Sequence, residues 1–161
     1  MKVHGRRRRA QRGAEMVEVS LIIVPILAFV FITFDLSMIV FLRSTFQHAV
    51  REGVRYGVTS QVDGSGYADD SIKNVVKRSA VGFLNSDTAA ATIHVRYMSP
   101  VDGSRTDNSK GNILQVSVEA YRYGPVTLFA KLGFPVNVYA RAYDLMEAAP
   151  PGALPPIHNP E

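Results

Sequence analysis

Residues 6–34 read RRRRAQRGAEMVEVSLIIVPILAFVFITF, and this stretch decides most of what the sequence predicts. Four consecutive arginines are followed by Gly13, two glutamates and a nearly uninterrupted apolar run. From Val19 to Leu42 only Asp35 is charged. A helix of this length rises about 36 Å, which exceeds the roughly 30 Å hydrocarbon core of a bilayer. The sequence therefore predicts one membrane-spanning helix, with Asp35 near its far end and within reach of the lipid headgroups.

The charges on either side of the apolar run differ. Residues 1–13 hold six of the 18 lysines and arginines and no acid, so the rest of the chain is slightly acidic although the net charge is +4. Positive charges before a span favour a cytoplasmic N-terminus, which would leave the residues beyond about Leu42 in the periplasm of a bacterium. The apolar run is too long for a secretory signal peptide. The arginines are explained by their effect on the orientation of the membrane span, so nucleic acid is not predicted as a partner.

Beyond the span, apolar and small residues recur at intervals of three and four, which predicts that the helix continues to about Val58. This stripe consists of Leu42, Phe46, Ala49, Val50, Gly53, Val54 and Gly57. Two interpretations remain open for it, namely packing on the protein's own sheet or packing between subunits. The first is favoured.

A smaller domain follows the helix. Asp69 or Asp70 is expected to cap a second helix, whose apolar positions run from Ile72 to Leu84. Three alternating stretches then predict half-buried antiparallel strands, with Ala120 expected on the inward face of the second one. These stretches are TIHVRYM at 92–98, ILQVSVEAYRY at 113–123 and VNVYARAYDLM at 136–146. Residues 124–134 are expected to close the core as a short helix or loop.

These patterns predict an α+β fold, in which a long N-terminal transmembrane helix continues into a stalk helix packed on a small antiparallel β-sheet. Four segments are predicted along the chain. Residues 1–13 form a basic cytoplasmic leader and residues 14–58 the transmembrane and stalk helix. Residues 59–147 form a periplasmic α+β domain, and residues 148–161, which hold five of the nine prolines, form a disordered tail.

Signals of catalysis are weak. The chain has no cysteine, which excludes disulfides, thiolate metal sites and cysteine nucleophiles. His48 and Glu52 lie one helical turn apart, but such pairs are common on solvated helix faces. The repeated VDGS at 62–65 and 101–104 fits Asp-Gly turns better than a calcium loop. We therefore predict no enzymatic activity, no cofactor and no metal.

Glu18 lies at the N-terminal end of the apolar run. An acid in this position costs free energy unless it stays close to the membrane surface or pairs with a cation. Cleavage after Gly13 would supply one, because Ala14 would become the new N-terminus and Glu18 the fifth residue of the mature chain. The free amino group of Ala14 in a neighbouring chain could then pair with Glu18.

A basic leader, Gly13, Glu18 and a long apolar helix together resemble the class III signal peptide of the type IV pilin superfamily. More of the chain resembles the TadE-like pseudopilins of tight-adherence pili, whose fold is pilin-like. The shared features are Val17-Glu18, an early proline at Pro25, an acid at Asp35, and a stalk motif made of Ala49, Arg51, Glu52, Gly53, Arg55 and Tyr56. Two positions depart from the pattern, because Val19 replaces a more usual aromatic residue and Glu15 adds a second acid.

The resemblance implies a minor pilin or pseudopilin that a prepilin peptidase processes after Gly13 and that helps to assemble a type IVb, Flp-type adhesive pilus. Its implied partners are that peptidase, other pseudopilins, the major pilin, the pilus secretion platform and the lipid bilayer. The implied location is the bacterial inner membrane, crossed once, with possible entry into the pilus. Two alternatives remain open: a permanently anchored periplasmic binding or sensing module, and a small anchored hydrolase.

Overall fold

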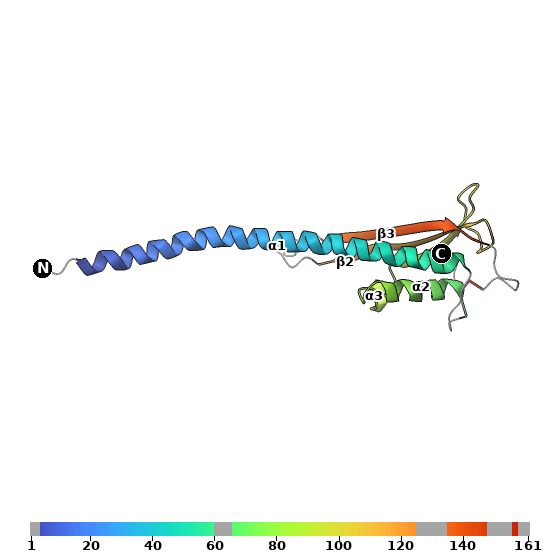
Figure 1. Ribbon diagram of the computed structural model, residues 1–161, viewed down its shortest axis with the longest axis horizontal. Helices are drawn as coiled ribbons and strands as arrows, with labels where there is room; N and C mark the ends of the chain where they lie inside the picture. The colour runs from blue at the N-terminus through green and yellow to red at the C-terminus, as the bar shows by residue number, and fades with distance from the viewer. Residues whose placement is uncertain (1–3, 60–65, 125–134, 148–155, 158–161) are drawn as a thin grey trace. The chain divides into compact units, whose positions relative to one another are not determined.

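The computed structural model describes residues 4–59, 66–124, 135–147 and 156–157. Along these residues the elements are α1 (His4–Val58), α2 (Ala68–Ser79), α3 (Asp87–Ala90), β1 (Ile93–Met98), β2 (Ile113–Tyr123) and β3 (Val136–Leu145) (Figure 1). A long N-terminal helix followed by a small antiparallel sheet confirms the predicted α+β, pilin-like fold. The chain divides into two units, the first made of Met1–Met38 with Gly124–Phe134 and the second of Ile39–Tyr123 with Pro135–Glu161.

In the first unit, α1 up to Met38 exposes its apolar side chains. The helix passes Pro25 without interruption. Leu21 and Phe29 are more than 70% exposed, and Phe34 is 62% exposed. A helix that is apolar on all sides belongs in a hydrophobic environment, because water would solvate these side chains poorly.

In the second unit, from Ile39 onward, α1 is amphipathic, with one exposed face and one buried face. Its exposed face carries charged and polar residues, among them His48, Arg51 and Arg55. Its buried face is the predicted stripe of Leu42, Phe46, Ala49, Val50, Gly53, Val54 and Gly57. The Phe46 ring meets the Tyr121 ring of β2 edge-on, with 4.8 Å between the ring centroids. Packing of the stripe on the protein's own core is therefore confirmed.

The beginning of α2 differs from the prediction. Its N-cap is Tyr67, whose side chain makes no capping hydrogen bond, so the expectation that Asp69 or Asp70 caps the helix was wrong. Both aspartates lie in the first turn, where a negative charge favours the positive end of the helix dipole. Pro156 supplies part of the missing cap, because its carbonyl oxygen accepts a hydrogen bond of 3.0 Å from the N–H of Ala68.

The end of α2 comes earlier than the apolar pattern suggested. The helix stops at Ser79 because Val81 and Gly82 have φ values of 52° and 86°, which no right-handed helix accommodates. Leu84 lies beyond the helix but is fully buried. The pattern therefore identified the buried residues correctly but not the end of the helix that precedes them.

The sheet has the order β1-β2-β3, and both pairings are antiparallel, as predicted. Val95 of β1 lies opposite Val116 of β2, which lies opposite Ala142 of β3. The inward residues of β1 and the first half of β2 are buried, namely Ile93, Val95, Tyr97, Leu114, Val116 and Val118. Together with the stripe of α1 and the apolar side of α2, they form the core of the second unit.

Ala120 is the exception to this alternation. The register of β2 with β3 shifts between Val118 and Tyr121, so Glu119 and Ala120 together oppose one residue of β3. Ala120 has a φ of 55° and is exposed, which corrects the prediction that it faces the core. The extra residue of this β-bulge brings Tyr121 to the inward side, where it contacts Phe46.

Three predictions fall wholly or partly outside the described residues. The Asp-Gly turn predicted at residues 62–65 is one of them. The segment expected to close the core lies in residues 125–134, and the tail of residues 148–161 is described only at Pro156 and Ile157. The four-segment division of the chain stays a prediction.

Candidate functional site

Not only the apolar side chains but also the hydroxyl groups in the first part of α1 suit a hydrocarbon environment. The hydroxyls of Ser20, Thr33 and Ser37 each donate to the carbonyl oxygen four residues earlier, at 2.8–2.9 Å. Helical hydroxyls bonded in this way need no water. The most apolar 18-residue window of this helix has no buried residue, and its length and composition fit a single-pass membrane anchor.

The predicted processing residues lie together near the start of this helix. Gly13 is exposed, and nothing lies within 4 Å of the position that a Cβ atom would occupy there. Ala14 follows it in α1, and Glu18 is exposed one turn further on. Glu15, the second acid, is also exposed. The helix therefore presents Gly13 and both acids on its surface.

The predicted stalk motif divides between two faces of α1. Ala49 and Gly53 are buried, Tyr56 is half-buried, and the charged members Arg51, Glu52 and Arg55 are exposed. A Cβ atom on Gly53 would lie 2.6 Å from Cγ2 of Val76, and one on Gly57 would lie 2.5 Å from Cδ2 of Leu114. The glycines of this segment thus permit close packing of α1 on α2 and the sheet, whereas the charged residues remain available to other molecules.

Asp35 lies in a different environment from the expected one. It is 5% exposed and has an interaction partner in the structure, whereas the sequence suggested a side chain open to the headgroups. The cost of burying a carboxylate is large unless the group is paired, so a buried position with a partner is the physically consistent one. Periodicity along one helix could not reveal this burial.

Comparison with known families bears on this helix. Residues 13–55 match the family described as TadE-like protein. The matched residues, called the TadE-like segment below, begin at Gly13 and end at Arg55, and they include Glu18, Pro25 and Asp35. The match confirms the resemblance seen in the sequence and links the chain to tight-adherence (Tad/Flp) pilus systems and their assembly components. No curated protein and no solved structure gives a significant match to the chain.

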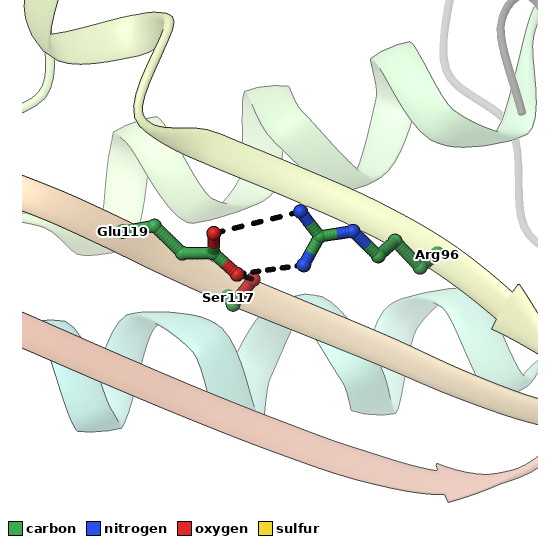
Figure 2. Close-up of polar contacts among 3 residues, drawn as sticks. All are labelled: Arg96, Ser117 and Glu119. Carbon is green, nitrogen blue, oxygen red and sulfur yellow. Dashed lines mark hydrogen bonds and ion pairs between the residues drawn. The ribbon is translucent and has the colours of Figure 1, made fainter. Parts of the chain in front are cut away.

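Outside the TadE-like segment, the sheet carries a polar cluster that sequence reasoning did not identify. Arg96 of β1 donates to both carboxylate oxygens of Glu119 on β2, at 2.6 and 3.5 Å, and the Ser117 hydroxyl donates to Glu119 Oε1 at 2.9 Å (Figure 2). These hydrogen bonds, with that from Arg96 the largest cause, lower the pKa of Glu119 to about 2. Arg96 and Glu119 are 23 residues apart in sequence, so only strand pairing brings them together.

A second electrostatic feature lies between α2 and β1. Tyr97 is 3% exposed, and burial together with the nearby charge of Asp69 raises the pKa of its phenol above the ordinary value. Asp69 itself is buried and has an interaction partner. A phenol held neutral in this way supports the core and does not supply a reactive group.

The remaining sequence candidates do not form a site in the part of the chain that the structure describes. No hydrogen bond or ion pair joins His48 to Glu52 there, and no group of three or more histidines and acids is arranged to hold a metal ion. Asp102 accepts hydrogen bonds from the amide and the hydroxyl of Ser104, and these lower the pKa of its carboxyl. This geometry, with a φ of 68° at Gly103, matches the Asp-Gly turn predicted for residues 101–104.

Proposed function

We propose that this protein is a minor pilin or pseudopilin of a tight-adherence (type IVb, Flp-type) pilus, processed by a prepilin peptidase after Gly13. The observation that carries the proposal is the TadE-like match, which begins at Gly13 and covers the apolar helix and most of the stalk. The exposure of Gly13 and the empty space around it support access by a peptidase.

Glu18 is proposed to pair with the free amino group of Ala14 in a neighbouring subunit. An exposed carboxylate beside a long apolar helix would enter a low-dielectric environment on assembly, and pairing with a cation would reduce the cost of that transfer. The proposed partners are the prepilin peptidase, other pseudopilins, the major pilin and the secretion platform.

The proposed location is the bacterial inner membrane, with residues 1–13 in the cytoplasm and the second unit in the periplasm. The cationic leader supports this orientation. The role is proposed to be one of assembly, without enzymatic activity.

The first test is the intact mass and N-terminal sequence of the membrane-extracted full chain, produced with and without a co-expressed prepilin peptidase. We expect a peptidase-dependent start at Ala14 that Gly13→Ala abolishes. Gly5→Ala is the matched control, because it changes a leader glycine eight residues before the proposed cleavage site. If the chain keeps residues 1–13 while a control pilin is cleaved, a permanently anchored periplasmic module replaces the pilin proposal.

The role of Glu18 is tested separately by cross-linking between subunits in membranes that contain the processed chain. We expect Glu18→Gln to remove the cross-linked species and Glu15→Gln to leave it in place, since both acids are exposed and only three residues apart. If Glu15→Gln has the larger effect, the pairing role belongs to Glu15.

A further inference from the structure

An open groove of about 590 Å³ runs along α1 in the second unit and is lined by residues outside the buried stripe. Its residues recur at intervals of three and four and therefore share one face of the helix. They are Val40, Arg43, Ser44, Gln47, His48 and Arg51. The groove thus combines one apolar residue at its N-terminal end with cationic and polar residues along the rest of its length.

The cations of this groove are not neutralised within the described part of the chain. Neither Arg43 nor Arg51 forms an ion pair with any residue described there, and the groove contains no acid. These two arginines therefore form a local positive patch on this face of α1. A patch of this kind favours an anionic ligand.

The position of the groove in the sequence indicates which anion it meets. Val40, which is 68% exposed, belongs to the apolar run that ends at Leu42, and Arg43 is the first cation after that run. The headgroup layer of each leaflet is roughly 5–8 Å thick, and helical rise places His48 about 7 Å beyond Arg43. Arg51 lies about 12 Å beyond Arg43, but helical side chains tilt toward the N-terminus, which here is the direction of the membrane.

We propose that this groove binds the phosphate headgroup of an anionic phospholipid in the periplasmic leaflet, with Arg43 and Arg51 as its cationic ligands. The inference rests on the membrane-anchored arrangement proposed above. Bound lipid would hold the stalk at a defined height above the bilayer and would have to leave before the helix is extracted into a filament.

The test uses the full chain reconstituted in vesicles of a neutral phosphatidylcholine that contain a small fraction of spin-labelled lipid. Electron paramagnetic resonance then measures how strongly the protein retains labelled phosphatidylglycerol relative to labelled phosphatidylcholine. We expect the double variant Arg43→Gln/Arg51→Gln to lower this preference by about fivefold for each arginine. Arg55→Gln is the matched control, because Arg55 is exposed on the same helix but does not line the groove.

All variants keep the leader, so its cations contribute equally to every measurement. If Arg55→Gln lowers the preference as much as the double variant does, the groove is not the site and the inference fails. It also fails if soluble glycerol 3-phosphate displaces the labelled lipid as well as unlabelled phosphatidylglycerol does, because the ligand would then be a free phosphate. It fails likewise if the preference appears only together with an acidic partner protein.

A second measurement, whether alkali extracts the chain from the vesicles, distinguishes failure of the lipid inference from failure of the proposed membrane anchor. A chain that resists extraction but shows no groove-dependent preference overturns the lipid inference and leaves the membrane anchor in place. A chain that alkali extracts overturns both.

Discussion

Gly53 of α1 and Val76 of α2 lie so close that a Cβ atom on the glycine would be 2.6 Å from Cγ2 of the valine. A helical valine has essentially one χ1 rotamer, so its methyl group cannot turn away and α2 itself would have to shift. The same hypothetical atom would lie 3.5 Å from Ile72 and 3.6 Å from Val116, which are ordinary contacts. Gly53 is therefore a point of very close approach between α1 and α2, as is Gly57, whose hypothetical Cβ atom would lie 2.6 Å from Cδ1 of Ile72.

We expect Gly53→Ala to lower the free energy of unfolding by about 1–2 kcal/mol, because overpacking costs more than the gain of about 1 kcal/mol in helix propensity. Thermal unfolding of the detergent-solubilised full chain, followed by near-ultraviolet circular dichroism, measures this change. Glu52→Ala is the control, since its exposed side chain touches no packed surface and alanine favours the helix. Equal stability of the Gly53→Ala variant and the wild type would show that α2 moves freely on α1.

Glu119 should make the stability of the protein depend on pH in the acidic range. Its folded pKa of about 2 lies below the ordinary value of 4.5, so its contribution is present above about pH 4.5 and is lost as the pH falls toward 2. Because the ion pair with Arg96 is partly exposed, we expect this contribution to be about 1 kcal/mol. Glu119→Gln should be less stable than the wild type at pH 7 by this amount, and the difference should disappear near pH 2. A constant difference across this range would contradict the role of the ion pair.

Tyr97 should make the stability of the protein depend on pH in the alkaline range. Burial and the charge of Asp69 raise its folded pKa, so the unfolded chain loses the phenolic proton first and stability falls as the pH rises above about 10. We expect Tyr97→Phe to lose less stability than the wild type between pH 9 and pH 11. Tyr143→Phe is the control, because Tyr143 is 71% exposed. If both variants follow the wild type, Tyr97 does not govern the alkaline transition.

Val81 offers a stabilising substitution. Its φ of 52° is strained for a β-branched residue, and its side chain is 70% exposed, so it gains little from burial. We expect Val81→Gly to raise the free energy of unfolding by about 0.5–1 kcal/mol, since glycine adopts this conformation without steric cost. Val101→Gly should bring no gain, because Val101 is also exposed but has no positive φ. Destabilisation by Val81→Gly would indicate that the valine side chain makes packing contacts that offset its strain.

Sequence patterns predicted the parts of this protein that depend on neighbours along the chain. The apolar run from Val19, the stripe on α1 that ends at Gly57, and the three alternating strands all follow from local periodicity, and the structure contains each of them. The end of α2 was missed because positive φ values at Val81 and Gly82 stop the helix inside a continuous apolar pattern. Ala120 was assigned to the wrong face because a bulge adds one residue, and strict alternation cannot anticipate that.

The sequence alone predicts a basic N-terminal segment, an apolar helix long enough to span a membrane and a small α+β domain after it, because hydrophobic period and charge are properties of consecutive residues. Three features became visible only in the folded structure: Arg96 pairs with Glu119, Asp35 is buried, and Gly53 must remain small against Val76. Each of these features depends on protein surroundings that consecutive residues do not specify. Arg96 meets Glu119, and Gly53 meets Val76, because separate elements of the fold pack together.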